Sequence, residues 1–196
     1  MKNKLVVLCG ESGVGKSTVK DIIVKRGILP NAISATTRQR RESEIEGEDY
    51  QFITQEEFLK MGNNNELLEH TSYYIPNEGY VYYGLPKKNV DLTKSSYITI
   101  LNPHGIEQVF KEMNPVDVLV IYIKRSDHDR VIDYLNREKG KDVREVLENC
   151  LERYTRDEID FRDIDLLADY MVENDGNMQD LFQRVVDIIV KELDIL

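Results

Sequence analysis

The chain has 196 residues, 41% of them hydrophobic, which is enough for one sizeable core but short for two independent domains. Its formal net charge of -10 argues against a general nucleic-acid or membrane-surface binder, because the average field of the protein repels polyanions. Cys9 and Cys150 have neither disulfide nor metal-ligand spacing, and no apolar run reaches the length of a membrane span. We therefore expect one α/β unit, in the cytoplasm, in which any phosphate site is locally basic.

The N-terminal segment predicts a strand, a loop and a helix. Leu5 to Cys9 is an apolar run, and Ser17 to Arg26 carries apolar residues on one helical face. The segment between them fits the phosphate-loop (P-loop) pattern G-x-x-x-x-G-K-[ST], in which glycines let backbone N–H groups surround phosphate oxygens. We assign to ATP phosphates the residues Gly10, Glu11, Ser12, Gly13, Val14, Gly15, Lys16, Ser17 and Thr18.

Two side chains of this loop have chemical roles in the pattern. Lys16 is expected to reach the β- and γ-phosphates, and Ser17 to place its hydroxyl on Mg²⁺, which neutralises charge on the transferred group. The alternative is a glycine turn that merely joins a strand to a helix.

The stretch from about Thr36 to Lys88 is polar and rich in tyrosine, which indicates an inserted subdomain. Thr54 and Glu57 form a capping-box pattern for a helix that Gly62 is expected to close. Short strands are expected at Tyr50 to Ile53, Leu67 to Glu69 and Tyr80 to Tyr83.

Regular α/β alternation resumes after this segment. Ser126 with Asp129 caps one helix, and residues 136–156 are dense in charge and poor in large apolar side chains, which predicts a mobile helical lid around Gly140. The remaining expected elements are strands at Tyr97 to Leu101, Val116 to Ile123 and Tyr170 to Val172, and helices at Gly105 to Met113 and Asn177 to Leu193.

Four further segments, taken in order with the P-loop, resemble the guanylate kinase family over nearly the whole chain. They are Ser34-Ala35-Thr36-Thr37-Arg38-Gln39-Arg40-Arg41, Glu46 to Phe52, Glu66 to Glu69, and Tyr82-Tyr83-Gly84. The resemblance implies an α/β P-loop kinase fold, with a central parallel sheet flanked by helices, that moves a phosphoryl group from ATP to GMP or dGMP. It divides the single domain into a core (1–33, 95–135 and 157–196), an acceptor-binding insert (34–94) and a lid (136–156).

The resemblance also implies the roles of individual residues. The GMP phosphate would be held by Arg38, Arg41, Tyr50 and Tyr83, and the guanine would be read by Ser34 and Glu69, with Asn102 also at the acceptor. Guanidinium groups match phosphate oxygens bidentately, and a carboxylate can accept from both N1–H and N2–H of guanine.

Catalysis in this family uses lid arginines to clamp the phosphates. Arg153 aligns best with one of them and Arg137 is the second choice, although Lys139 competes for that position. Together with Lys16 they form the expected catalytic set.

Three departures from the family pattern affect base recognition. Leu85 replaces a Ser or Thr that contacts guanine, and Ile100 and Asn102 replace two aspartates. The His70 to Val81 connection is also longer than usual. We expect weaker guanine contacts and intact phosphate contacts.

Two alternatives to this function stay open. One is a P-loop kinase for another nucleotide or a phosphorylated sugar, and the other is a catalytically silent guanylate-kinase-like module that binds proteins. The expected partners are ATP and GMP or dGMP, with no nucleic acid and no membrane, and the sequence leaves the oligomeric state open.

Overall fold

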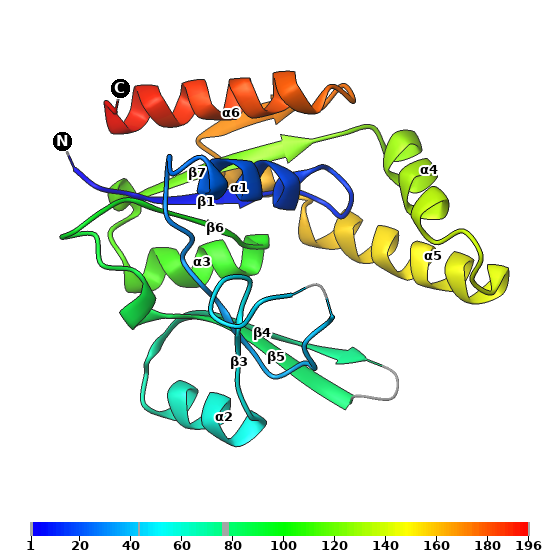
Figure 1. Cartoon of the computed structure of the whole chain (residues 1–196), viewed down its shortest axis with the longest axis horizontal. Helices are drawn as coiled ribbons and strands as arrows, with labels where there is room; N and C mark the ends of the chain where they lie inside the picture. The colour runs from blue at the N-terminus through cyan, green and yellow to red at the C-terminus, as the bar shows by residue number, and fades with distance from the viewer. Residues whose placement is uncertain (1, 43, 76–78, 196) are drawn as a thin grey trace.

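A parallel sheet forms the centre of the protein (Figure 1). The computed structural model describes residues 2–42, 44–75 and 79–195. The strand order is β6-β1-β7-β8, and each neighbouring pair is parallel. These strands are β1 (Leu5–Cys9), β6 (Tyr97–Ile100), β7 (Val118–Lys124) and β8 (Tyr170–Glu173).

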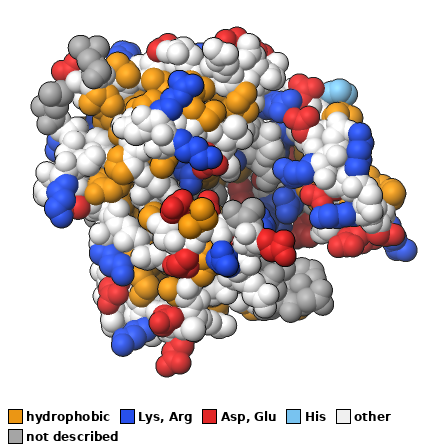
Figure 2. All heavy atoms as spheres, in the orientation of Figure 1, with side chains coloured by type: hydrophobic (Ala, Val, Ile, Leu, Met, Phe, Trp, Pro, Cys, Tyr) orange, Lys and Arg blue, Asp and Glu red, His pale blue; other side chains and the backbone are white. Residues whose placement is uncertain are grey.

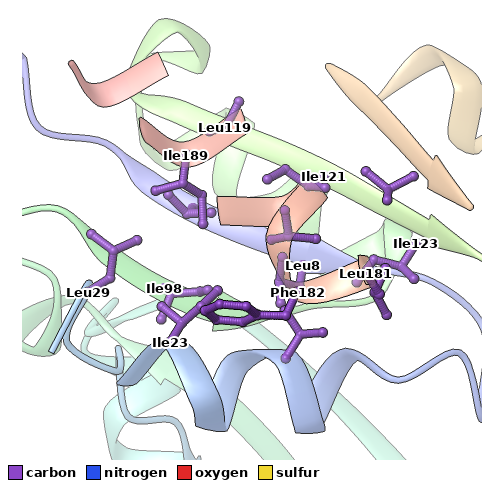
Figure 3. Packing of buried hydrophobic residues seen from close by; sticks show 14 of the residues in the cluster. Leu8, Ile23, Leu29, Ile98, Leu119, Ile121, Ile123, Leu181, Phe182 and Ile189 are labelled. Carbon is purple, nitrogen blue, oxygen red and sulfur yellow. The ribbon is translucent and has the colours of Figure 1, made fainter. Parts of the chain in front are cut away.

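Both faces of this sheet are covered, which explains why β1 is apolar at every position. Val6 and Leu8 point to one face, where they pack against helices α1 (Lys16–Lys25) and α6 (Met178–Leu193), as Figure 3 shows for Leu8. The alternate residues of β1 join the second core cluster, with α3 (Pro103–Glu112). The period of two in a strand therefore divides one apolar run between two cores.

A second sheet, of order β3-β2-β5-β4, belongs to the insert. Its strands are β2 (Ala35–Thr36), β3 (Gln51–Phe52), β4 (Leu67–Ile75) and β5 (Gly79–Pro86). Phe58 of helix α2 (Gln55–Asn63) packs on it with Ala35 and Leu67. The predicted capping box of Thr54 and Glu57 is confirmed, because each side chain bonds the other residue's backbone N–H.

Two helices, α4 (Asp127–Arg137) and α5 (Val143–Asp160), form a hairpin that projects from the body (Figure 1). Their N-caps are Ser126, as predicted, and Asp142. The turn between them contains Gly140 at φ +92°. Helix α5 continues four residues beyond residue 156, the predicted end of the lid. The predicted division into core, insert and lid stays a prediction.

Several predicted bounds were wrong. Val116 and Asp117 lie in a 3₁₀ helix (Pro115–Asp117) because the Asn114 side chain accepts from the N–H of Val116. Much of the stretch from His70 to Val81 is strand of the β4–β5 hairpin, although residues 76–78 of it lie outside the described residues. Two more 3₁₀ helices are Lys87–Asn89 and Ile164–Leu166. None of the helices in the described ranges has the length and apolarity needed to cross a bilayer.

Candidate functional site

The P-loop lies between β1 and α1, and two of its glycines are required by geometry. Gly10 has φ +152°, and a Cβ there would lie 2.3 Å from the carbonyl oxygen of Ile123. Gly15 is the N-cap of α1 at φ +97°, and a Cβ there would lie 3.1 Å from Cε of Met178. A side chain at Gly10 would therefore clash with β7, and the positive φ of Gly15 favours glycine there.

Lys16 folds back over this loop. Its Nζ donates to the carbonyl oxygens of Gly10, at 2.6 Å, and Glu11, at 2.8 Å. Burial lowers its pKa from 10.5 to about 8, against the opposing effect of the nearby acidic groups. A phosphate oxygen would offer this ammonium a charged partner in place of two neutral carbonyls.

A cavity of about 330 Å³, which we call the P-loop pocket, opens between the loop and the α4–α5 hairpin. The P-loop pocket is lined by Arg137 and Arg153, which were both predicted to clamp the phosphates. Their guanidinium carbons lie 5.3 and 5.4 Å from the ring centroid of Tyr134. Lys139 is not among its described lining residues. Charged side chains gather around this hollow in Figure 2. Its other lining residues include Ser12, Gly13, Gly15, Lys16, Ser17, Thr18, Arg125, Arg130 and Asp157.

A second cavity, of about 370 Å³, lies between the P-loop and the insert, and we call it the insert pocket. Ser12, Lys16 and Asp157 line this pocket and also the P-loop pocket. The two cavities therefore meet at the P-loop. Five of the residues predicted for the acceptor line the insert pocket, namely Ser34, Tyr50, Glu69, Tyr83 and Asn102.

Glu69 is the buried acid of the insert pocket, 5% exposed. Desolvation raises its pKa from 4.5 to about 7, against a backbone hydrogen bond from Leu85. A Cβ added at Gly105 would lie 3.1 Å from its Oε2, so the carboxyl group lies against the first turn of α3. A ligand with N–H donors would compensate the charge of this carboxylate.

Asn102 has a structural task as well as a place in this pocket. Its Oδ1 accepts from the N–H of Gly105 at 2.8 Å, which caps α3, and its Nδ2 donates to the Tyr73 hydroxyl at 3.2 Å. The predicted helix start is therefore two residues late, since Pro103 is already helical.

Arg38 and Arg41 line a neighbouring cavity of about 350 Å³ that also contains Ser34, Tyr50 and Tyr83. The Arg38 guanidinium forms a two-pronged ion pair with Glu44, at 2.6 and 2.8 Å, and its Nε donates to the Tyr83 hydroxyl at 3.0 Å. This pairing lowers the pKa of Glu44 to about 2. The four residues predicted to hold the GMP phosphate thus line one cavity, and Arg38 among them is already paired with Glu44.

Comparison with known proteins decides the family. The Guanylate kinase family model matches residues 2–192. The chain belongs to the guanylate kinase family. Among its relatives are the guanylate kinase of Enterococcus faecalis, 35% identical over 96% of this chain and 88% of that one, and that of Lactobacillus acidophilus, 32% identical over 95% and 89%. The crystal structure of guanylate kinase from Anaplasma phagocytophilum superposes with a TM-score of 0.67 at 25% identity, covering 97% of this chain and 86% of that one. The predicted family and α/β fold are thereby confirmed.

Leu85, one of this chain's departures from the guanylate kinase pattern, is fully buried in the second core cluster. Ile100 and Asn102, which stand where the family pattern has two aspartates, line the insert pocket. These two departures therefore lie in the same pocket as Glu69, whereas Leu85 is not among the described residues that line it.

Among the lining residues that sequence reasoning missed are one tyrosine and three charged residues. Tyr73, interpreted as a plain strand residue, lies in the insert pocket, and it is on the same face of β4 as Glu69 because the two are four residues apart. Arg156 lines the same pocket, Arg130 lines the P-loop pocket, and Asp157 lines both. The alternation of strand β4 was the available signal for Tyr73, whereas the other three depend on how α4 and α5 pack.

Proposed function

We propose that this chain transfers the γ-phosphoryl group of ATP to GMP, or to dGMP, and releases a nucleoside diphosphate and ADP. The observation that carries the proposal is the meeting of two pockets at Lys16 and Ser12. A donor in the P-loop pocket and an acceptor in the insert pocket would present their phosphates to each other at these two residues.

The proposed roles in the P-loop pocket follow from charge. Lys16 tracks the transferred group, while Arg137 and Arg153 compensate the negative charge that spreads over its oxygens in the transition state. No covalent intermediate is required, since this chemistry depends on positioning and charge neutralisation.

The proposed roles in the acceptor site divide between phosphate and base. Arg38, Arg41, Tyr50 and Tyr83 hold the phosphate of the acceptor, and Ser34 and Glu69 read its guanine. The buried carboxyl of Glu69 supports a guanine acceptor, because adenine has no matching pair of donors. A phosphorylated sugar would leave this carboxylate without a partner.

Mg²⁺ is part of the proposal, and the residues present fit it. The described residues contain no cluster of three or more His, Cys, Asp or Glu side chains that could hold a metal ion. Mg²⁺ characteristically takes few protein ligands and completes its shell with water and substrate phosphates. Ser17, in the P-loop pocket, would supply the protein oxygen, and the ion would neutralise charge on the phosphates.

A coupled ADP-release assay with Mg·ATP and GMP, dGMP, IMP, AMP, CMP or UMP tests the proposal. GMP or dGMP should give the highest kcat/KM, and we expect the reaction in the cytoplasm. The control without acceptor measures hydrolysis of ATP by water. A higher kcat/KM for AMP, CMP or UMP would contradict the guanine assignment, and ADP release that no acceptor stimulates would favour a binding module.

A further inference from the structure

Arg130 is a buried cation of α4 that contacts the P-loop. Its side chain is 7% exposed. Its Nε donates to the carbonyl oxygen of Ser12 at 3.0 Å, and its Nη2 donates to Oδ2 of Asp157 in α5 at 2.6 Å. One guanidinium thus joins both helices of the hairpin to the loop.

Asp157 completes a closed ring of hydrogen bonds. The same Oδ2 accepts from the backbone N–H of Ser12 at 2.8 Å. The N–H and the C=O of Ser12 are therefore both fixed by side chains of the hairpin, one by Asp157 and one by Arg130. Ser12 lines both pockets, so this ring holds the backbone where the two cavities meet.

The charges around Arg130 matter because the neighbouring pocket is suited to a polyanion. Asp127 accepts from its Nη1 at 2.8 Å, and Oε1 of Glu11 lies 3.8 Å from the same nitrogen. With Asp157, three carboxylates surround one guanidinium. Loss of Arg130 would leave the negative charge of these carboxylates uncompensated beside the P-loop pocket. Because the local dielectric constant is low there, this charge would repel the phosphates of a bound nucleotide.

We propose that Arg130 and Asp157 are positioning residues for the donor nucleotide. They hold the backbone of Ser12 in the conformation that binds Mg·ATP. They also make the affinity for ATP depend on the contact between the α4–α5 hairpin and the P-loop. The inference rests on the proposed function only in naming ATP as the polyanion. A merely structural ion pair would affect both substrates alike. Of the two pockets, Arg130 lines only the P-loop pocket, so its loss should act mainly on the donor.

Four variants separate these two roles: R130K, R130M, D157N and the double variant R130M/D157N. The measurements are the Kd of a non-hydrolysable ATP analogue with Mg²⁺ by calorimetry, the KM values for ATP and GMP, and the melting temperature. R144M is the matched control, because Arg144 of α5 is exposed and pairs with Glu148, so it removes the same charge from the same hairpin without touching the P-loop.

R130M should weaken the ATP analogue by about tenfold or more and leave the KM for GMP within about twofold. The double variant should bind the analogue more tightly than R130M, because one of the three uncompensated carboxylates is gone. R130K keeps the charge, but its single nitrogen cannot occupy the places of Nε, Nη1 and Nη2, which contact Ser12, Asp127 and Asp157. It should therefore fall between wild type and R130M with a melting temperature near wild type, and it decides the matter if R130M does not fold.

Equal losses for ATP and GMP, losses that follow the melting temperature, or a loss in R144M as large as that in R130M would overturn the proposal. The calorimetric Kd needs no turnover. Absence of GMP-stimulated ADP release in the wild type would therefore contradict the proposed function and still leave the role of Arg130 measurable.

Discussion

The guanidinium carbon of Arg156 in α5 lies 5.5 Å from the ring centroid of Tyr73 in β4. Both residues line the insert pocket, and Arg156 also pairs with Glu152 at 2.7 Å. This cation–π contact joins the α4–α5 hairpin to the insert across the cavity that we assign to the acceptor. An acceptor bound there would touch both of the parts expected to close over the substrates.

Closure should be visible in hydrogen exchange of residues 136–156. Val146 and Asp157 are the buried residues of α5, and Val143, Leu147 and Leu151 are exposed, so few apolar contacts hold this hairpin. A bisubstrate analogue should slow hydrogen exchange in the hairpin, because the analogue would contact the hairpin and the insert together and hold them closed. Peptides from α6 serve as the internal control. Identical exchange with and without the analogue would disprove closure.

Replacement of Lys16 by Ala should lower kcat by about 100-fold or more. The variant loses the cation to which we assign the transferred phosphoryl group, and phosphoryl transfer depends on such charge compensation. Folding should survive, since among the described residues Nζ donates to the backbone carbonyls of Gly10 and Glu11 and to no side chain. Steady-state kinetics with a melting curve checks both expectations. Near wild-type turnover in the folded variant would mean that the loop is not the catalytic ATP site.

The parts of the structure that the sequence predicted are those encoded by neighbouring residues. The P-loop is contiguous, and its strand and helix carry clear periodicity, so β1 and α1 lie where expected. The caps at Thr54 and Ser126 need only three following residues. Such elements can be predicted because the residues that determine them are neighbours in the sequence and need no tertiary contact.

The missed contacts depend on packing between distant segments. Arg130 and Asp157 are 27 residues apart, and only the turn of the hairpin brings them together at Ser12. Asp157 also lies just past the predicted lid, among residues that the sequence assigns to the core. Strand β4 was predicted too short because its polar and tyrosine residues are stabilised by β5 across the hairpin, which no single segment reveals.

The ion pair between Arg38 and Glu44 was not predicted from the sequence, although its partners are only six residues apart. The position of Arg38 and Arg41 can be tested by substitution. Replacement of Arg38 or Arg41 by Met should raise the KM for GMP far more than that for ATP, because both residues line the cavity that we assign to the acceptor phosphate. The two KM values, measured with the other substrate saturating, decide this. Equal changes for both substrates would contradict the assignment.

Glu44→Gln should have a different effect from these arginine variants. It leaves a buried guanidinium without its charged partner, which costs stability in the free protein. The phosphate of GMP would supply the missing charge. GMP should therefore raise the melting temperature of this variant more than that of the wild type, and no difference between them would mean that the phosphate lies away from Arg38.

Glu69→Gln should change both folding stability and its pH dependence. The pKa of Glu69 is raised from 4.5 to about 7 by burial, so between these values the folded state binds a proton that the unfolded state does not. Wild-type stability should therefore fall as pH rises from 4.5 to 7, by roughly 3 kcal/mol for the full shift. Glu69→Gln should lack this slope, which urea unfolding at several pH values would measure. An unchanged slope would mean that another group titrates.

GMP binding should show the opposite dependence on pH at the same residue. Glu69 must be ionised to accept from N1–H and N2–H of guanine together, so the free protein has to release a proton below pH 7 and the KM for GMP should rise there. Glu69→Gln should lack that dependence. It serves as the control, because the phosphate of GMP titrates in the same way in assays of both proteins. The variant should also lose more activity with GMP than with IMP, because IMP lacks the amino group that the carboxylate would bind. Equal losses with the two acceptors, or the same pH profile in both proteins, would place the guanine away from Glu69.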